Sequence, residues 1–291
     1  MLNRGYMIHR ASVKWGIGDA LNMRAFLLTY CKQKGTKPKD INLYMEANHY
    51  IFENEGFIIG NNKREFMGLT AYPNFGYIDI QKKFDIKKCD ESIAKETDTD
   101  FSFDTIVPLN WNTKIDISLP KNFVTINNGY GKSVQDIGDN YVYLKKWLHT
   151  YWEELVLKIG VPCVQIGGGI SCKPIKGCVL NLVDKLSVKE SAEVMKRALF
   201  HIDIEGMLPI LNQHIGGRSV VLFGATGIED KGRSFNLNLS SNTCTPCYEW
   251  GTFKYRKLRL LRNQLLCDQR CMKDLKPDYV IERIYEEGWL K

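Results

Sequence analysis

The sequence predicts an α/β protein with two domains and a parallel sheet in its second half. The 291-residue chain is 44% hydrophobic and 25% charged, which is enough apolar content for two cores and too much for a disordered chain. A strand, a glycine-containing loop and a helix open the sequence. From residue 123 onwards strands and helices alternate, an order typical of a parallel sheet covered by helices on both faces.

The first half has weaker patterns than the second. Residues 7–13 indicate a strand, and the apolar spacing of residues 20–31 indicates a helix. Three further short strands are expected, at residues 41–45, 76–80 and 105–109. The many charges of residues 82–99 favour a surface loop or a short exposed helix. We place the end of this first domain near residues 119–122, which gives a domain of residues 1–121.

The second domain, residues 122–275, has regular alternation. Strands are expected at residues 123–127, 162–166, 200–204 and 219–223. Helices are expected at residues 147–159, 188–199 and 207–214. Ser187 and Glu190 form a capping box before the second of these helices. Residues 276–291 carry an apolar stripe and are interpreted as a final helix.

The net charge of +7 favours an anionic ligand or surface, such as a sugar nucleotide, a lipid headgroup or nucleic acid. No run approaches the roughly 20 apolar residues of a membrane span, and the first residues lack the apolar core of a signal peptide. We therefore expect a cytoplasmic protein. Peripheral contact with the inner face of the membrane and an oligomeric state are both left open.

Four of the nine cysteines form two close pairs, Cys244-x2-Cys247 and Cys267-x3-Cys271. This spacing predicts a tetrahedral Cys₄ site for structural zinc or iron, spanning residues 244–271. A closed site leaves no open position for catalysis, so the metal is expected to fold a small knuckle.

The other cysteines are interpreted as small apolar residues: Cys31, Cys89, Cys163, Cys172 and Cys178. Between the two pairs lies the basic segment 254–262. It is interpreted as a solvated helix face, or as a contact for an acceptor, a membrane surface or nucleic acid.

Several of these features occur together, and in the same order, in one known family. They are Gly18-Asp19 at the first helix entrance, Lys145-x-Trp147 before a helix, the Val-Val-Leu-Phe-Gly run at residues 220–224, and the late cysteine pairs. On these residues the chain resembles glycosyltransferase family 9, the ADP-heptose heptosyltransferases, most strongly over residues 123–277. The cysteine module resembles that of the relatives that glycosylate autotransporter proteins.

The resemblance implies the GT-B architecture, in which two Rossmann-like domains face a cleft and the second domain holds most of the donor. The final helix, residues 276–291, would pack back toward the first domain. A carboxylate at the first helix entrance would deprotonate the acceptor hydroxyl, and Asp19 matches that position. Taken by itself, an aspartate there is more often a helix N-cap, and the resemblance shifts the interpretation to a catalytic base.

The departing diphosphate needs a cation or amide donors. Lys145 matches the family's lysine, with Lys146 as the alternative because Leu148 stands where relatives have proline. Asn127 and Asn128 end a strand at the edge where such sheets bind their ligands, so they are candidate donors.

Two glycine-containing loops are further candidates. Gly224 and Thr226 follow an apolar strand, and their backbone N–H groups are candidates for binding phosphate. Residues 165–169, which read Gln-Ile-Gly-Gly-Gly, end an earlier strand and are a second candidate lining. The three glycines are interpreted mainly as a tight turn.

The chain departs from the family in the turn that carries an acid near the donor sugar. Glu205 and Gly206 are the preferred match, with Asp203 in reserve, while Pro209 stands where a histidine is expected. Asn181 replaces the acid that contacts the ribose in relatives. The sugar and the base are therefore left open, with an ADP-heptose-like donor as the first expectation.

We interpret the protein as an inverting glycosyltransferase that moves a heptose-like sugar from a nucleotide diphosphate to a saccharide or protein hydroxyl, with no catalytic metal and no nucleic-acid partner. One alternative is a Cys₄ metal-ribbon protein that binds nucleic acid. A second is a catalytically inactive, glycosyltransferase-like binding subunit, which the altered turn at Glu205 keeps open.

Overall fold

The protein divides into two compact units, residues 1–107 and residues 108–291. The computed structural model describes residues 10–13, 16–45, 48–60, 91, 93–95, 97–129, 145–241, 243–244, 246 and 268–291. Both units contain a parallel sheet, so the predicted α/β class is confirmed.

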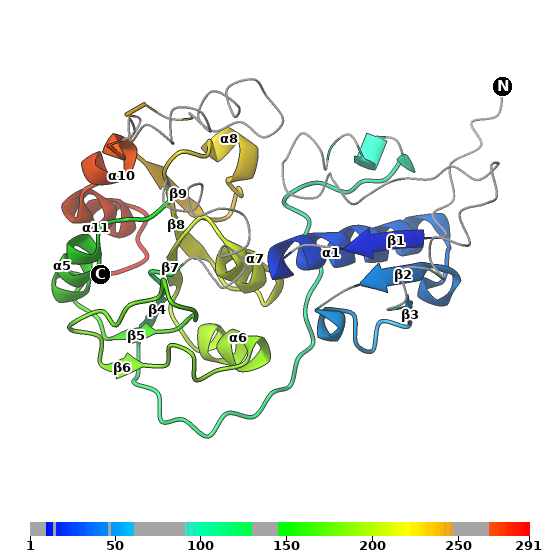
Figure 1. Ribbon diagram of the computed structural model, residues 1–291, viewed down its shortest axis with the longest axis horizontal. Helices are drawn as coiled ribbons and strands as arrows, with labels where there is room; N and C mark the ends of the chain where they lie inside the picture. The colour runs from blue at the N-terminus through cyan, green and yellow to red at the C-terminus, as the bar shows by residue number, and fades with distance from the viewer. Residues whose placement is uncertain are drawn as a thin grey trace. The chain divides into compact units, whose positions relative to one another are not determined.

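The first unit contains a three-stranded parallel sheet in the order β1-β2-β3 (Figure 1). Its elements are β1 (Arg10–Val13), α1 (Ile17–Lys34), the 3₁₀ helix η1 (Pro38–Asp40), β2 (Asn42–Met45), the 3₁₀ helix η2 (His49–Ile51) and β3 (Ile58–Gly60). Helix α1 buries an apolar face that includes Leu21, Phe26 and Tyr30, and the Phe26 ring packs edge-on against Phe101 at 5.4 Å between centroids. The expected strand at residues 7–13 is confirmed over Arg10–Val13, and residues 7–9 lie outside the described residues. The expected strand at residues 41–45 and the first helix are confirmed, although the helix begins earlier, at Ile17.

Other expectations for the first half have mixed outcomes. Residues 76–80 lie outside the described residues. Residues 105–109 do not form a strand, and one reason is that Pro108 has no N–H to donate to a ladder. The described positions between 91 and 97 are helical, but Ile93 is fully buried rather than exposed.

The second unit contains a six-stranded, fully parallel sheet in the order β6-β5-β4-β7-β8-β9. Its strands are β4 (Val124–Ile126), β5 (Cys163–Gln165), β6 (Leu180–Asn181), β7 (His201–Ile204), β8 (Ser219–Phe223) and β9 (Leu237–Ser240). Its helices are α5 (His149–Lys158), α6 (Val188–Lys196), α7 (Met207–His214), α8 (Ile228–Lys231), α10 (Arg270–Asp274) and α11 (Pro277–Glu286). All the strands and helices expected in this half are confirmed, including the Ser187–Glu190 capping box.

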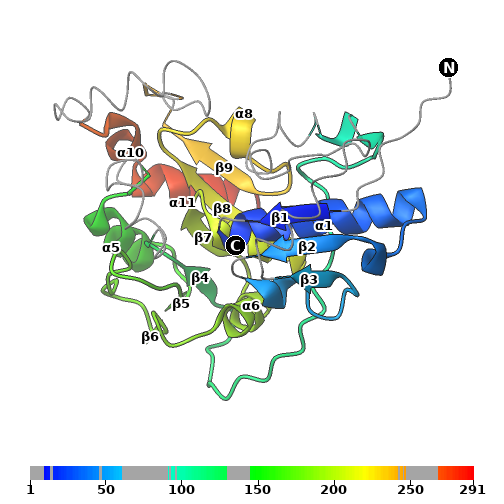
Figure 2. The ribbon, with the colours of Figure 1, turned by 45° about the vertical axis from the view of Figure 1, so that its right-hand side comes forward.

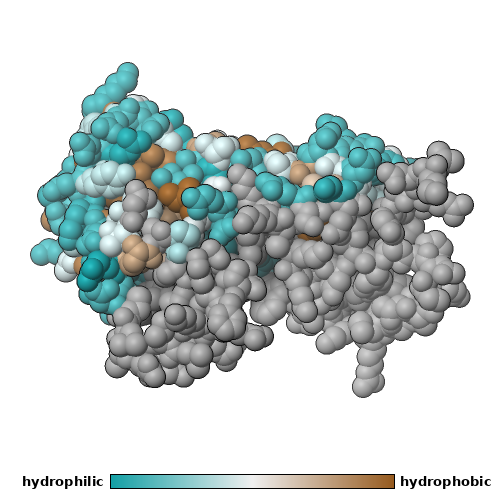
Figure 3. Space-filling model, turned by 90° about the horizontal axis from the view of Figure 1, so that it is seen from above, coloured by the Kyte–Doolittle hydropathy of each residue, from teal (hydrophilic) through white to brown (hydrophobic). Residues whose placement is uncertain are grey.

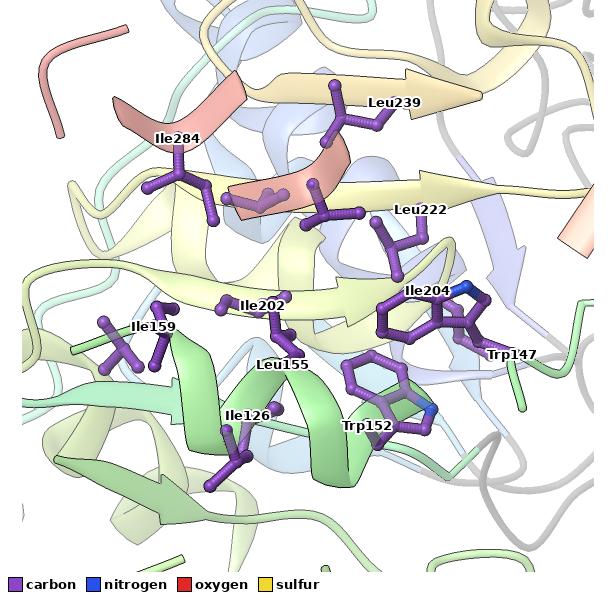
Figure 4. Packing of buried hydrophobic residues seen from close by; sticks show 14 of the residues in the cluster. Ile126, Trp147, Trp152, Leu155, Ile159, Ile202, Ile204, Leu222, Leu239 and Ile284 are labelled. Carbon is purple, nitrogen blue, oxygen red and sulfur yellow. The ribbon is translucent and has the colours of Figure 1, made fainter. Parts of the chain in front are cut away.

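Helices cover both faces of this sheet, with α5 and α11 on one face and α6 and α7 on the other (Figures 1 and 2). The core on the α5 and α11 side is large and apolar. Figure 4 shows Trp147 and Trp152 next to each other at one end of the displayed cluster, with ring centroids 4.8 Å apart and planes at 89°. Helix α11 contributes the fully buried Val280 and Ile284. Burial of this apolar core is the main force that holds α5 and α11 against the sheet.

Residues 108–121, which the sequence placed in the first domain, group with the second unit, and Leu109 and Trp111 are hydrogen-bonded to it. The backbone N–H of Leu109 donates to the carbonyl of His214 at 2.8 Å. The ammonium group of Lys196 donates to the carbonyl of Trp111 at 3.0 Å. The division between the units therefore falls at Val107 and Pro108.

The described surface in Figure 3 is mostly hydrophilic, with hydrophobic residues in small patches. Among the described residues, no helix is long and apolar enough to cross a membrane.

Candidate functional site

The candidate site lies at the carboxyl edge of the second sheet, where four neighbouring strands end in polar or glycine residues. Strand β4 is followed by Asn127 and Asn128, β5 ends at Gln165, and β7 and β8 are followed by residues 205–206 and 224–227. The register pairs Ile126 with Gln165 and Ile204 with Leu222, so these ends are level. Ligands of open parallel sheets bind at this edge.

A cluster of charged side chains surrounds Glu205, immediately after β7. The ammonium group of Lys145 contacts Oε2 of Glu205. From helix α8, the Nζ atom of Lys231 lies 3.2 Å from Oε1. The hydroxyl of Thr226 donates to Oε2 at 2.9 Å. The structure thus brings together three residues that the sequence nominated separately, Lys145, Glu205 and Thr226.

Lys231 is a member of this cluster that sequence reasoning missed. It ends a four-residue helix directly after the loop at residues 224–227. A lysine within one short helix of a predicted phosphate loop is the signal that could have identified it. The exposed fractions of the side chains of Lys145, Glu205 and Lys231 are 12%, 10% and 7%, so all three charges are largely buried.

The charge of Glu205 is set by this environment. Burial pushes the pKa of its carboxyl group up, but the two ammonium groups and the hydrogen bonds from Lys145 and Thr226 outweigh burial and lower the pKa to about 2. Glu205 is therefore an ionised carboxylate at neutral pH, and it acts as an acceptor for cations and hydroxyl groups.

Asn127 is held by a buried polar network beneath the same edge. Its Nδ2 donates to Oδ1 of Asp203 at 2.9 Å, and its Oδ1 accepts from the N–H of Gly129 at 3.0 Å. Oδ2 of Asp203 lies 3.3 Å from Nε2 of His201, whose Nδ1 lies 3.0 Å from the Thr125 hydroxyl. Burial raises the pKa of Asp203, against the opposing effect of His201. Asp203 therefore positions Asn127 from inside the sheet.

Gln165, at the end of β5, connects the two other candidate donor-binding residues, Asn128 and Asn181. Its Nε2 donates to Oδ1 of Asn128 at 3.2 Å, and its Oε1 accepts from Nδ2 of Asn181 at 3.3 Å. It also accepts the backbone N–H of Ile175 at 2.8 Å. Asn128, Gln165 and Asn181 therefore form one connected row across the ends of β4, β5 and β6.

Two glycines are required by packing in this region. A Cβ on Gly129 would lie 2.6 Å from Cβ of Cys172, and one on Gly167 would lie 2.3 Å from Oδ1 of Asn127. Gly167 also has φ of 114°, in the region that favours glycine. The glycines after β5 thus permit a tight turn, as the sequence suggested.

Asp19 lies in the first unit, within the first turn of α1. The helix was expected from residue 20, but Gly16 is the N-cap and the helix starts at Ile17. Oδ2 of Asp19 accepts the backbone N–H of Gly16 at 3.0 Å. Asp19 therefore has the helix-capping role, and this contact fixes one oxygen of the carboxylate.

The predicted Cys₄ site is described only at its two outer ligands. Cys244 is exposed and Cys271 is buried, while Cys247, Cys267 and the basic segment 254–262 lie outside the described residues. The Ser241 hydroxyl donates to the carbonyl of Cys271 at 2.8 Å, so the chain segments that carry the two pairs are adjacent. Within the described ranges, no three His, Cys, Asp or Glu side chains are grouped to hold a metal.

The remaining described cysteines fit the apolar interpretation. Cys31, Cys163 and Cys172 are buried and Cys178 is half-buried. Burial raises the pKa of Cys31 and Cys172 to about 11 and that of Cys163 and Cys178 to about 12, so these thiols stay protonated at neutral pH. Cys89 lies outside the described residues.

Solved glycosyltransferase structures have a similar fold. A glycosyltransferase family 9 protein from Veillonella parvula matches with a TM-score of 0.65 and 12% identity, over 97% of this chain and 98% of that one. The iron-containing dodecameric glycosyltransferase TibC from enterotoxigenic E. coli matches with a TM-score of 0.61 and 14% identity, over 96% and 76%. TibC in complex with ADP-D-β-D-heptose matches with a TM-score of 0.59 and 11% identity, over 98% and 78%.

A scan of protein-family models and a search of curated proteins give no match. At these identities the structural similarity establishes the fold. The α/β fold of the GT-B glycosyltransferases, which the resemblance implied, is therefore confirmed.

Proposed function

We propose that the protein is an inverting glycosyltransferase that transfers a heptose-like sugar from a nucleoside diphosphate, with ADP-heptose as the first candidate. The acceptor would be a hydroxyl group of a saccharide or protein. The observation that carries this proposal is the buried cluster of Lys145, Lys231, Thr226 and Glu205 at the carboxyl edge of the second sheet. The fold shared with family 9 structures, including a TibC complex with ADP-D-β-D-heptose, supports it.

The donor would lie along this edge. Lys145 would face the diphosphate, where its positive charge stabilises the negative charge that develops as the nucleotide leaves. Backbone N–H groups of the loop that contains Gly224 and Thr226 would add donors to the phosphate oxygens. Gly206 has no side chain and leaves the space in front of β7 open to the donor sugar.

Asn181 would offer its half-buried amide to the nucleoside, and Asn127 and Asn128 would contribute groups at the end of β4 to the sugar. Gln165, which is fully buried and hydrogen-bonded at both amide atoms, would hold this row in place. Amides are neutral and both donate and accept hydrogen bonds, so they can bind ribose hydroxyl groups. Because Asn181 stands in place of an acid, adenine is one of several bases that the donor nucleotide could carry.

Asp19 would act as the base. Its carboxylate takes the proton of the acceptor hydroxyl as the oxygen attacks the anomeric carbon, and the bond from that carbon to the diphosphate breaks with its electrons passing to the phosphate oxygen. A single displacement of this kind inverts the anomeric configuration. The N–H of Gly16, which holds Oδ2, would keep the carboxylate oriented during the transfer.

A structural metal would be held by Cys244, Cys247, Cys267 and Cys271. Thiolate ligands suit both zinc and iron. The hydrogen bond from Ser241, just after β9, to the Cys271 carbonyl in α10 supports this assignment. Pro246 lies against Gly227, because a Cβ on Gly227 would be 3.2 Å from its Cβ. A metal in this knuckle would therefore support the phosphate loop from the side. Metal analysis of the purified protein and of Cys271→Ser tests this, because zinc or iron should fall in the variant.

The test of the donor class is a thermal-shift panel of ADP, GDP, UDP and CDP, with and without their sugars. A ligand that binds the folded protein raises its apparent stability by mass action. We expect one nucleotide to give a selective shift that is lost in Lys145→Ala and kept in Lys176→Ala, which removes an exposed lysine of the same unit. Absence of any shift in the wild-type protein would overturn the proposal. Donor binding without donor breakdown, with every acceptor supplied, would instead favour an inactive binding subunit.

A further inference from the structure

Lys231 reaches the Glu205 carboxylate from a different element and on a different side from Lys145. Lys145 contacts Oε2 and Lys231 contacts Oε1, so each carboxylate oxygen has its own ammonium group. The side chains of Lys231 and Glu205 are both largely buried, and Lys231 ends the short helix that follows the Gly224–Gly227 loop. Two lysines thus converge on one carboxylate at the edge where the donor would bind.

The position that the carboxylate fills between these lysines also suits a phosphate group. Carboxylate and phosphate oxygens have similar spacing, which is why the same cationic groups recognise both. The Thr226 hydroxyl, which donates to Oε2 at 2.9 Å, would donate equally well to a phosphate oxygen. Two ammonium groups and a hydroxyl therefore supply the positive charge and hydrogen-bond donors that a diphosphate site needs.

We propose that Lys231 is a second diphosphate-binding lysine, and that Glu205 is an internal counterion that the diphosphate of the donor displaces from one or both lysines. This inference rests on the proposed function, because it assigns residues to the same donor site. Glu205 balances one of the two buried positive charges and orients both ammonium groups when the donor is absent. Its competition with the diphosphate lowers the affinity for the nucleotide and favours release of the nucleoside diphosphate product.

Opposite effects are expected from the two kinds of substitution. Lys231→Ala removes a charge-assisted contact and should weaken ADP binding by about tenfold or more. Glu205→Gln removes the competing charge, keeps the side-chain shape, and should tighten ADP binding. Lys231→Arg keeps the positive charge and should retain most of the affinity.

The measurement is the affinity of each variant for ADP, AMP and inorganic pyrophosphate by titration calorimetry, with Lys176→Ala as the control. The ratio of ADP to AMP affinity isolates the β-phosphate, because the nucleoside is common to both ligands. A purely structural defect at Lys231 would weaken both nucleotides equally and leave this ratio unchanged. Thermal unfolding without ligand identifies any variant that is not folded, and Lys231→Gln then replaces Lys231→Ala.

The outcomes separate the two proposals. If wild-type protein binds neither ADP nor any other nucleoside diphosphate, both the function and the role of Lys231 are overturned. If wild-type protein binds and Lys145→Ala weakens binding while Lys231→Ala keeps the wild-type ratio, the function stands and the role of Lys231 is wrong. Weaker ADP binding by folded Glu205→Gln would contradict displacement of the carboxylate.

Discussion

The indole N–H of Trp147 donates a hydrogen bond to the carbonyl oxygen of Leu275 at 2.7 Å. Both residues are fully buried. The bond joins the segment that carries Lys145 to the chain just before α11, so the C-terminal region holds a candidate donor-binding lysine in place. The contact spans a sequence separation of 128 residues, and it depends on the completed fold.

Trp147→Phe should lower the free energy of unfolding by about 1–3 kcal/mol, because the Leu275 carbonyl would remain buried without its donor. Nucleotide affinity should fall as well, since Lys145 lies two residues away. Urea unfolding and nucleotide titration measure the two effects. Tyr151→Phe is the control, because its hydroxyl donates to the Lys273 carbonyl at an exposed site and should matter less. Equal stability losses in the two variants would contradict the anchoring role.

Glu205 should make the protein sensitive to acid. Its pKa in the folded protein is about 2, below the ordinary value of 4.5, so it contributes stability above about pH 4.5 that is lost as the pH falls toward 2. Glu205→Gln should be less stable than wild type at neutral pH. Thermal unfolding measured at several pH values should show this stability difference shrinking as the pH falls from about 4.5 toward 2. A difference that does not change with pH would show that the carboxylate charge is not responsible.

Asp203→Ala should destabilise the protein by about 1–3 kcal/mol or more, because the buried Asn127 amide and the Ile204 N–H lose their acceptor. Asp203→Asn keeps an oxygen at the same position and should cost less. If Asp203 positions Asn127, both the free energy of unfolding and the nucleotide affinity should be highest in wild type, lower in Asp203→Asn and lowest in Asp203→Ala. Unchanged nucleotide affinity in a folded Asp203→Ala protein would show that Asn127 does not contribute to the donor site.

Gly129→Ala should destabilise the protein, because its new Cβ would lie 2.6 Å from Cβ of Cys172, and overpacking of this kind costs about 1–3 kcal/mol. Gly60→Ala is the matched control, since no atom lies within 4 Å of a Cβ built there. Chemical denaturation of the two variants tests the comparison. Similar stability of both would show that the loop around Cys172 relaxes without cost.

Asp19→Asn should reduce sugar transfer by about 10²–10⁴-fold if Asp19 is the general base. The substitution keeps an oxygen that can accept the Gly16 N–H, so the start of α1 should be preserved. Nucleotide affinity should therefore remain at the wild-type value. Transfer at an undiminished rate would leave Asp19 with the capping role alone.

Sequence patterns predicted the central strands and the longer helices of the second unit well, because these strands are buried, rich in β-branched residues and bounded by glycine, proline or polar residues. Strand β6 has two residues, and β9 reads Leu-Asn-Leu-Ser. Both depend on pairing with β5 and β8 rather than on a local pattern, and both were missed. The local pattern was also insufficient at residues 105–109, where β-forming residues surround Pro108 but the described structure has no strand.

The residues of the candidate site could be predicted one by one, but their contacts with one another could not. Lys145, Glu205 and Thr226 were nominated from separate motifs, and each lies at the end of a recognisable element. Their mutual contact was not predictable, because it depends on the order of strands in the sheet. Lys231 carries no motif and became a candidate only when α8 placed it 3.2 Å from Glu205.

The strand order also has a consequence for how the protein forms during synthesis. Strand β4 pairs with β5 and with β7, and β7 is made only after β5, β6 and α6. The half of the sheet that contains Asn128, Gln165 and Asn181 can assemble while the ribosome is still translating the rest. Asn127 must wait for Asp203, and the lysine cluster must wait for residue 231. Until β7 is made, the growing chain exposes the open edge of β4, so an aggregation-sensitive intermediate is expected at this stage.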